Sequence, residues 1–120
     1  MTRNPKLAVD TLDAPDRVDS ADARDRAVAA VAKALAHPAR VRILRILARR
    51  SCICGELVDE LPLAQSTVSQ HLKVLRSAGL IAGTVDGPRS CYMLDREGMS
   101  RARSLLSPLL TELAESPGCC

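Results

Sequence analysis

The chain has 120 residues, a formal net charge of +3 and 47% hydrophobic residues, which predicts one globular domain with a usable core. It has one tyrosine and no phenylalanine or tryptophan, which predicts an aliphatic, helical core and disfavours single-stranded nucleic-acid binding through aromatic stacking. No apolar run reaches the roughly 18 residues of a membrane span and no signal-peptide segment opens the sequence, so we expect a cytoplasmic protein with mostly reduced cysteines and no membrane partner.

The chain is expected to divide into an arm, a domain and a tail. Residues 1–20 are polar, rich in aspartate and interrupted by Pro5 and Pro15, which predicts a flexible N-terminal arm. The folded domain is expected over residues 21–115. Residues 116–120 form a short tail that contains cysteine.

Two helices are predicted at the start of the domain. The first begins near Ala21 and carries Val31 and Leu35 on one face. Proline is disfavoured inside a helix and favoured in its first turn, so the second helix should begin near Pro38. This second region is basic, with arginines at positions 40, 42, 45, 49 and 50.

A helix-turn-helix is predicted next. A short helix over about residues 55–61 is ended by Pro62, and a turn leads into a longer helix over about residues 66–77. Gly79 suits the left-handed position after that helix, and Thr67 begins a sequence that resembles a capping box. The inward face is marked by apolar residues at i, i+4 and i+7, namely Val68, Leu72 and Leu75.

A β-hairpin and a terminal helix complete the domain. Strand-like runs over residues 80–85 and 90–94 flank Asp86-Gly87, a strong hairpin signal. The terminal helix is expected to bend at Pro108, and its apolar stripe is wider than so small a core needs. The sequence therefore predicts a mainly α winged helix-turn-helix with a small β-hairpin, a homodimer whose terminal helices form the interface. The stripe consists of Met99, Ala102, Leu106, Leu109 and Leu113.

The second helix of a helix-turn-helix lies in the major groove of duplex DNA. Glutamine pairs bidentately with adenine, serine and threonine bind several bases, and Lys73 and Arg76 suit phosphates. A dimer would need a pseudo-palindromic operator with half-sites roughly 34 Å apart. The alternative is an ordinary solvated helix face. His71 is interpreted as a DNA-facing or a packing residue rather than as a metal ligand. The candidate DNA-binding residues are Gln65, Ser66, Thr67, Ser69, Gln70, His71, Lys73 and Arg76, with Arg89 beside the hairpin tip.

Cys52 and Cys54 stand where the helix-turn-helix begins. Residues i and i+2 lie about 200° apart on a regular helix, so chelation by both needs local unwinding, which would link ion binding to DNA affinity. Thiolates prefer soft ions such as As(III), Sb(III), Cd(II), Pb(II), Zn(II) and Cu(I), and a three-coordinate all-sulfur site fits trivalent arsenic best. Cys119 and Cys120 are candidates for the missing ligand, for a separate site, or for an incidental tail. Cys91 is interpreted as a packing residue of the wing.

No enzyme motif is present in the sequence. It has neither a Gly-rich phosphate loop nor a Gly-x-Ser-x-Gly sequence, so we expect no catalytic residue and no organic cofactor. His37 is interpreted as a helix cap or a packing residue.

Three segments resemble the ArsR/SmtB family of metalloregulatory repressors, a resemblance that covers about residues 25–115. They are residues 35–44 (Leu-Ala-His-Pro-Ala-Arg-Val-Arg-Ile-Leu), 52–57 (Cys-Ile-Cys-Gly-Glu-Leu) and 65–81, whose Gln-Ser-Thr-Val-Ser-Gln-His-Leu sequence is the most specific. The resemblance implies a dimeric winged-helix repressor that leaves DNA when it binds its ion.

The resemblance also bears on the ligands. Cys52 and Cys54 match two thiols of the arsenic-type site, whose third cysteine would fall at Leu57. Some arsenic-responsive relatives use cysteines near the C-terminus. Cadmium and lead sensors add a thiol from the N-terminal arm, which has none here, and the zinc-type ligands of the terminal helix are missing.

The function expected is therefore a repressor released from its operator by As(III) or Sb(III). A methylated arsenical, which needs only two thiols, is an alternative inducer. The other readings are a redox-sensing or cadmium/lead-sensing repressor of the same fold, and a winged-helix interaction module without a ligand.

Overall fold

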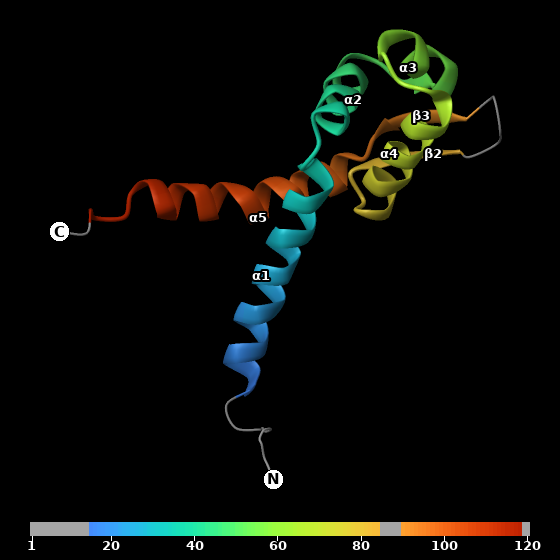
Figure 1. The fold of residues 1–120 in the computed structure, drawn as a ribbon. Coiled ribbons are helices and arrows are strands. Elements are labelled where there is room, and N and C mark those ends of the chain that lie inside the picture. Colours follow the sequence, from blue (N-terminus) through green and yellow to red (C-terminus); the bar gives the residue numbers. More distant parts are fainter. Residues whose placement is uncertain (1–14, 85–89, 119–120) are drawn as a thin grey trace.

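The fold is a winged helix-turn-helix from which two long helices project (Figure 1). A computed structural model describes residues 15–84 and 90–118 of the chain. The elements follow one another as α1 (Pro15–Leu35), α2 (Pro38–Arg49), β1 (Cys52–Ile53), α3 (Cys54–Glu60), α4 (Gln65–Ser77), β2 (Ile81–Thr84), β3 (Cys91–Leu94) and α5 (Arg96–Ala114). The expected order of helices and hairpin is confirmed.

The first helix begins earlier than predicted. We expected a flexible arm up to residue 20, but α1 starts at Pro15. Proline fits the first position of a helix because it lacks only an N–H that would have no partner there. Acidic residues near a helix start also favour it through the helix dipole. Residues 15–20, assigned to the arm in our prediction, are therefore helical, and the rest of the arm lies outside the described residues.

The wing contains a strand that the sequence did not predict. The sheet has the order β1-β3-β2 with antiparallel pairing, and β1 sets Cys52 opposite Tyr92 and Ile53 opposite Cys91. The turn at Asp86-Gly87 and the candidate Arg89 lie outside the described residues. Strand β1 ends where α3 begins and pairs with β3, so it connects α3 directly to the wing.

The core is aliphatic, as expected, and is built around α4. Val68, Leu72 and Leu75 are each at most 1% exposed, which confirms the predicted inward face. They pack with residues from α2, α3 and the segment after α4, including Ile43, Leu57 and Leu80.

Most of the helix ends lie where the sequence predicted them. The His37 Nδ1 accepts a hydrogen bond from the Ala39 backbone N–H at 3.1 Å and so caps α2, which begins at Pro38 as predicted. Gly79 has a φ of 79°, the left-handed conformation predicted for it. The capping box predicted at Thr67 is wrong: the N-cap of α4 is Ala64, which has no side-chain hydrogen-bond acceptor.

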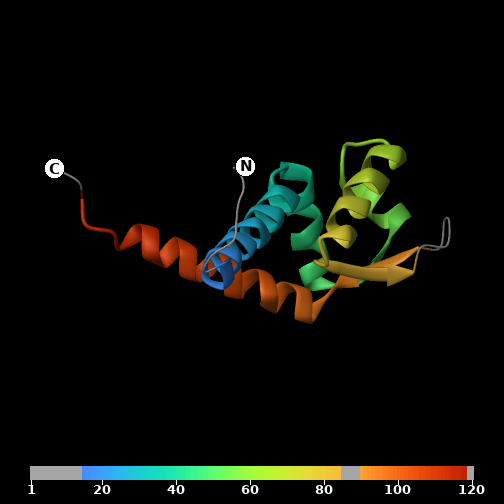
Figure 2. The same ribbon diagram turned by 90° about the horizontal axis from the view of Figure 1, so that it is seen from below.

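Helices α1 and α5 extend away from the rest of the fold. Figures 1 and 2 show them crossing near the base of the winged domain and diverging from there. The radius of gyration is 19.0 Å, against about 14 Å for a compact chain of this length. Helix α5 continues through Pro108, and its Leu110 and Leu113 are each 61% exposed. Among the described residues, no helix has the length and apolarity needed to cross a membrane.

Candidate nucleic-acid interface and thiol pair

Helix α4 presents a polar surface without negative charge. Its 13 residues contain no acidic side chain and carry two basic ones, Lys73 and Arg76. An anion can therefore approach this face of the helix without meeting a fixed negative charge on it. The predicted DNA-binding residues that are exposed on it are Gln65, Ser66, Thr67, Ser69, Gln70, Lys73 and Arg76.

The N-terminal half of α4 holds the side chains suited to base edges. Gln65, Ser66, Thr67, Ser69 and Gln70 cluster in its first two turns, the part of a recognition helix that contacts bases. Lys73 and Arg76 follow in its second half, where a positive charge suits a phosphate.

His71 does not belong to this surface. Its side chain is buried, at 8% exposure, and its ring centroid lies 4.3 Å from that of His37. The Nδ1 of His71 lies 3.5 Å from a guanidinium nitrogen of Arg40. Burial, followed by the charges of His37 and Arg40, lowers the pKa of His71. The prediction that His71 contacts DNA is therefore wrong, because the ring packs between α4 and the start of α2.

Cys52 and Cys54 are both buried, at 1% and 5% exposure. Cys52 lies in strand β1 and Cys54 is the first residue of α3, so the two cysteines do not lie on one regular helix. Side chains at i and i+2 of an extended chain point to the same side. The strand residues 52–53 directly before α3 thus provide the departure from regular helical geometry that two ligands at this spacing need.

The Cys54 thiol contacts the recognition helix directly. Its Sγ lies 3.9 Å from the Ser69 Oγ, and its backbone N–H donates to the Ser90 carbonyl at 3.1 Å. Cys54 therefore contacts both α4 and the residue that directly precedes strand β3 of the wing. The sequence indicated Ser69 only as a DNA contact, and no sequence signal pairs residues 54 and 69.

Electrostatics around Cys52 favour the neutral thiol. Burial raises its pKa, and this effect outweighs the guanidinium of Arg50, which acts in the opposite direction. Arg50 itself forms ion pairs with Glu60 and Glu56 of α3, the latter at 3.4 Å. These contacts therefore do not produce the accessible, low-pKa kind of thiol that reacts readily with oxidants.

The donor set fits a soft ion but gives two sulfur ligands. No group of three metal-binding side chains occurs within residues 15–84 and 90–118. Cys91 is half-buried and lies opposite Ile53, whereas Cys52 lies opposite Tyr92, so the two thiols belong to alternate positions of the sheet. The candidates Cys119 and Cys120 lie outside the described residues.

Comparison with known proteins gives a consistent result. Residues 37–82 match the family described as bacterial regulatory protein, arsR family. An uncharacterized HTH-type transcriptional regulator of Mycobacterium tuberculosis is 40% identical over 85 residues, which span 67% of this chain and 75% of that regulator.

Solved structures share the fold. A crystal structure of a possible transcriptional regulator for arsenical resistance has 29% identity and a TM-score of 0.60, covering 73% of this chain and 97% of that one. The NMR structure of a homodimeric winged helix-turn-helix DNA-binding domain from Mycobacterium bovis has 28% identity and a TM-score of 0.62. It covers 85% of this chain and 94% of its own.

Proposed function

The chain belongs to the arsR family of bacterial regulatory proteins, and we propose that it is a homodimeric repressor which trivalent arsenic or antimony releases from operator DNA. Members of this family are DNA-binding transcriptional regulators and not enzymes. The proposed site of action is the cytoplasm, where thiols stay reduced. The observation that carries the proposal is the contact between the Cys54 thiol and Ser69 of the recognition helix.

Cys52 and Cys54 would hold the inducer, which supplies a soft, thiophilic centre when bound. Both thiols are buried in the native packing, so they must leave it to bind a common ion. Moving Cys54 would break its contact with Ser69 and strain its backbone hydrogen bond to Ser90. The recognition helix and the wing would then change together, and DNA affinity falls if the ion binds the altered conformation more tightly.

We propose that Gln65, Ser66, Thr67, Ser69 and Gln70 face base edges, while Lys73, Arg76 and the wing residue Arg89 contact the backbone or minor groove. Two copies are needed for a pseudo-palindromic operator. The exposed leucines of α5 support a dimer, since an apolar surface on a projecting helix is stabilised by a partner. Homodimerisation of the related Mycobacterium bovis domain supports the same assembly.

The inducer depends on the number of sulfur ligands. Arsenite itself would need a third, from Cys119 or Cys120 of either subunit or from a small thiol. A methylated arsenical would need only the Cys52–Cys54 pair. The related structure of a possible transcriptional regulator for arsenical resistance supports a metalloid inducer, and cadmium or lead is the alternative inducer. The raised pKa and burial of Cys52 argue against peroxide sensing at this thiol.

The decisive experiment is fluorescence anisotropy of the reduced protein on the DNA upstream of its own gene, at fixed salt. Arsenite, methylarsenite, cadmium and zinc are titrated in turn. Release by an arsenical alone supports the proposal, and the more effective arsenical shows whether three thiols or two are used. Release by peroxide with no arsenical effect would instead favour a redox sensor. Absence of any duplex binding would favour an interaction module.

A further inference from the structure

A basic groove lies between α1 and α4, outside the surface assigned to base reading. It has a volume of about 420 Å³ and is lined from α1 by Ala30, Lys33 and Ala34. Arg40 of α2 contributes to it, and α4 with the residue after it supplies Lys73, Val74, Ser77 and Ala78. Three alanines make much of the lining small, which lets a ligand approach the backbone closely.

The charge of this groove is not neutralised locally. Lys33, Arg40 and Lys73 all contribute to it, and no carboxylate lines it. Lys33 and Lys73 are exposed, and neither forms an ion pair with another residue of the described segments. Two ammonium groups and a guanidinium around one groove attract an anionic group such as a phosphodiester.

Arg40 fixes the geometry of the groove. Its Nε donates to the Ala34 carbonyl at 2.7 Å and its Nη2 donates to the Lys33 carbonyl at 3.2 Å. Its Nη1 lies 3.5 Å from the His71 Nδ1 on α4. Three of the five N–H donors of a guanidinium are thus used to hold the end of α1 against α4, which leaves donors for a ligand.

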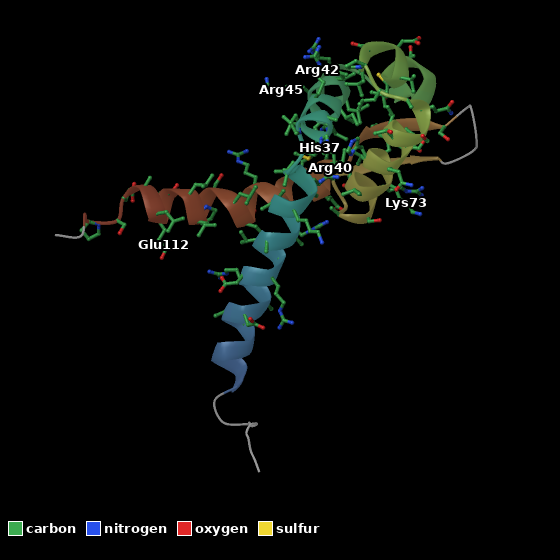
Figure 3. All side chains as sticks on the ribbon, viewed as in Figure 1. His37, Arg40, Arg42, Arg45, Lys73 and Glu112 are labelled. Carbon is green, nitrogen blue, oxygen red and sulfur yellow. The ribbon has the colours of Figure 1, made fainter. Side chains whose placement is uncertain are left out.

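The groove is continuous with the recognition helix. Lys73, which we propose as a phosphate contact, lines it and lies on the same helix as the base-reading residues. Figure 3 shows Lys73 extending from α4 and Arg40 at the junction of α1 and α2 beside it, while Arg42 and Arg45 extend from the outer side of α2. A DNA strand that contacts Lys73 would therefore pass close to the end of α1.

We propose that Lys33 of α1 contacts the DNA backbone. Together with Lys73 and Arg40, it would bind a phosphodiester at the edge of the major groove that α4 reads. The inference rests on the proposed DNA-binding function and extends the interface to a helix otherwise assigned to dimerisation. Such a contact adds affinity without sequence information.

The test is the salt dependence of DNA binding by Lys33→Gln in the full-length protein. Each phosphate contact contributes about 0.9 to the slope of log K against log salt concentration, so a symmetric dimer should lose about 1.8. The loss of slope should be equal on operator and on unrelated duplex DNA, and the loss of affinity should grow as the salt concentration is lowered. Lys33→Arg, which keeps the charge, should restore most of the slope.

Arg42→Gln is the matched control, because it removes one exposed positive charge from the outer side of α2 and should leave the slope unchanged. A thermal melt confirms that each variant is folded. An unchanged slope for Lys33→Gln, while Lys73→Gln lowers it, overturns the inference but leaves the proposed function intact. Wild-type protein that binds no duplex at all overturns both.

Discussion

The Sγ of Cys54 lies 3.9 Å from the Oγ of Ser69, so the candidate inducer site and the candidate DNA-reading helix meet at one side-chain contact. The thiol belongs to α3 and the hydroxyl to α4, the two helices of the helix-turn-helix. A ligand that binds the Cys54 thiol must therefore alter its contact with Ser69. Coupling between the sites needs no relay of intervening residues.

Cys54→Ser should therefore separate DNA binding from release. Serine is close to cysteine in size and its hydroxyl can keep the hydrogen bond to Ser69, so operator affinity should stay within about threefold, or less than 1 kcal/mol. Arsenite should no longer release the protein, because oxygen is a poor ligand for a soft centre. Cys52→Ser should behave alike, with some loss of stability from the buried hydroxyl.

Cys91→Ser is the control for these variants. Cys91 is half-buried and opposite Ile53, so its replacement should preserve both DNA binding and arsenite release. Anisotropy titrations of all three variants provide the measurement. Arsenite release that persists unchanged in both Cys52→Ser and Cys54→Ser would exclude this pair as the site.

Protein stability should fall as the pH is lowered from 7 towards 5, through protonation of His71. Burial first, and then the charges of His37 and Arg40, lower its pKa in the folded state below the ordinary 6.5. Below pH 6.5 the unfolded chain binds this proton more readily than the folded one, so the free energy of unfolding decreases until the folded pKa is also passed.

His71→Gln should flatten this pH dependence while lowering stability at pH 7, because an amide does not titrate in this range. Urea denaturation at several pH values between 5 and 7.5 measures the effect. His37→Asn serves as a comparison, since asparagine also caps helices well and leaves His71 in place. Equal pH profiles for wild type and His71→Gln would assign the titration to other groups.

Two glycines make a close contact that should resist substitution. A Cβ on Gly98 would lie 1.7 Å from the Gly79 carbonyl oxygen, which is backbone and cannot move aside. Gly79→Ala would strain a left-handed backbone by about 1–2 kcal/mol and crowd only the flexible Arg101 side chain. Gly98→Ala should therefore destabilise the protein more than Gly79→Ala.

Gly55→Ala is the control for the glycine variants, because nothing lies within 4 Å of its added Cβ and alanine favours a helix. Thermal unfolding followed by circular dichroism gives the ranking. A Gly98→Ala variant as stable as Gly55→Ala would contradict the contact between the start of α5 and the turn after α4.

Sequence periodicity predicted most of this fold, and its failures have local physical causes. The inward face of α4 was recognised from apolar residues alone, although His71 stands three residues after Val68 and four before Leu75, on the same face. Because histidine is polar, His71 was not recognised as an interior residue, although the helical period places it on the buried face. The two-residue strand β1 was missed because it depends on pairing with β3, forty residues away, and has no local alternation.

The candidate sites were predictable to different degrees. The cysteine spacing and the polar face of α4 are visible in the sequence, because ligand type and helix period are local properties. The contact between Cys54 and Ser69, and the meeting of Lys33 with Lys73, join residues from different helices. Only tertiary packing determines such pairs.

The last prediction concerns assembly through α5. Leu110 and Leu113 are each 61% exposed, and each leucine buried in a dimer contributes about 2 kcal/mol. The double variant Leu110→Glu/Leu113→Glu should be a monomer in sedimentation velocity, and it should bind the operator far more weakly because each monomer contacts a single half-site. Thr111→Glu adds a negative charge to an exposed position turned away from these leucines, so it should stay dimeric. A double variant that still sediments as a dimer would show that subunits associate through another surface, and the projecting half of α5 would then need a different partner.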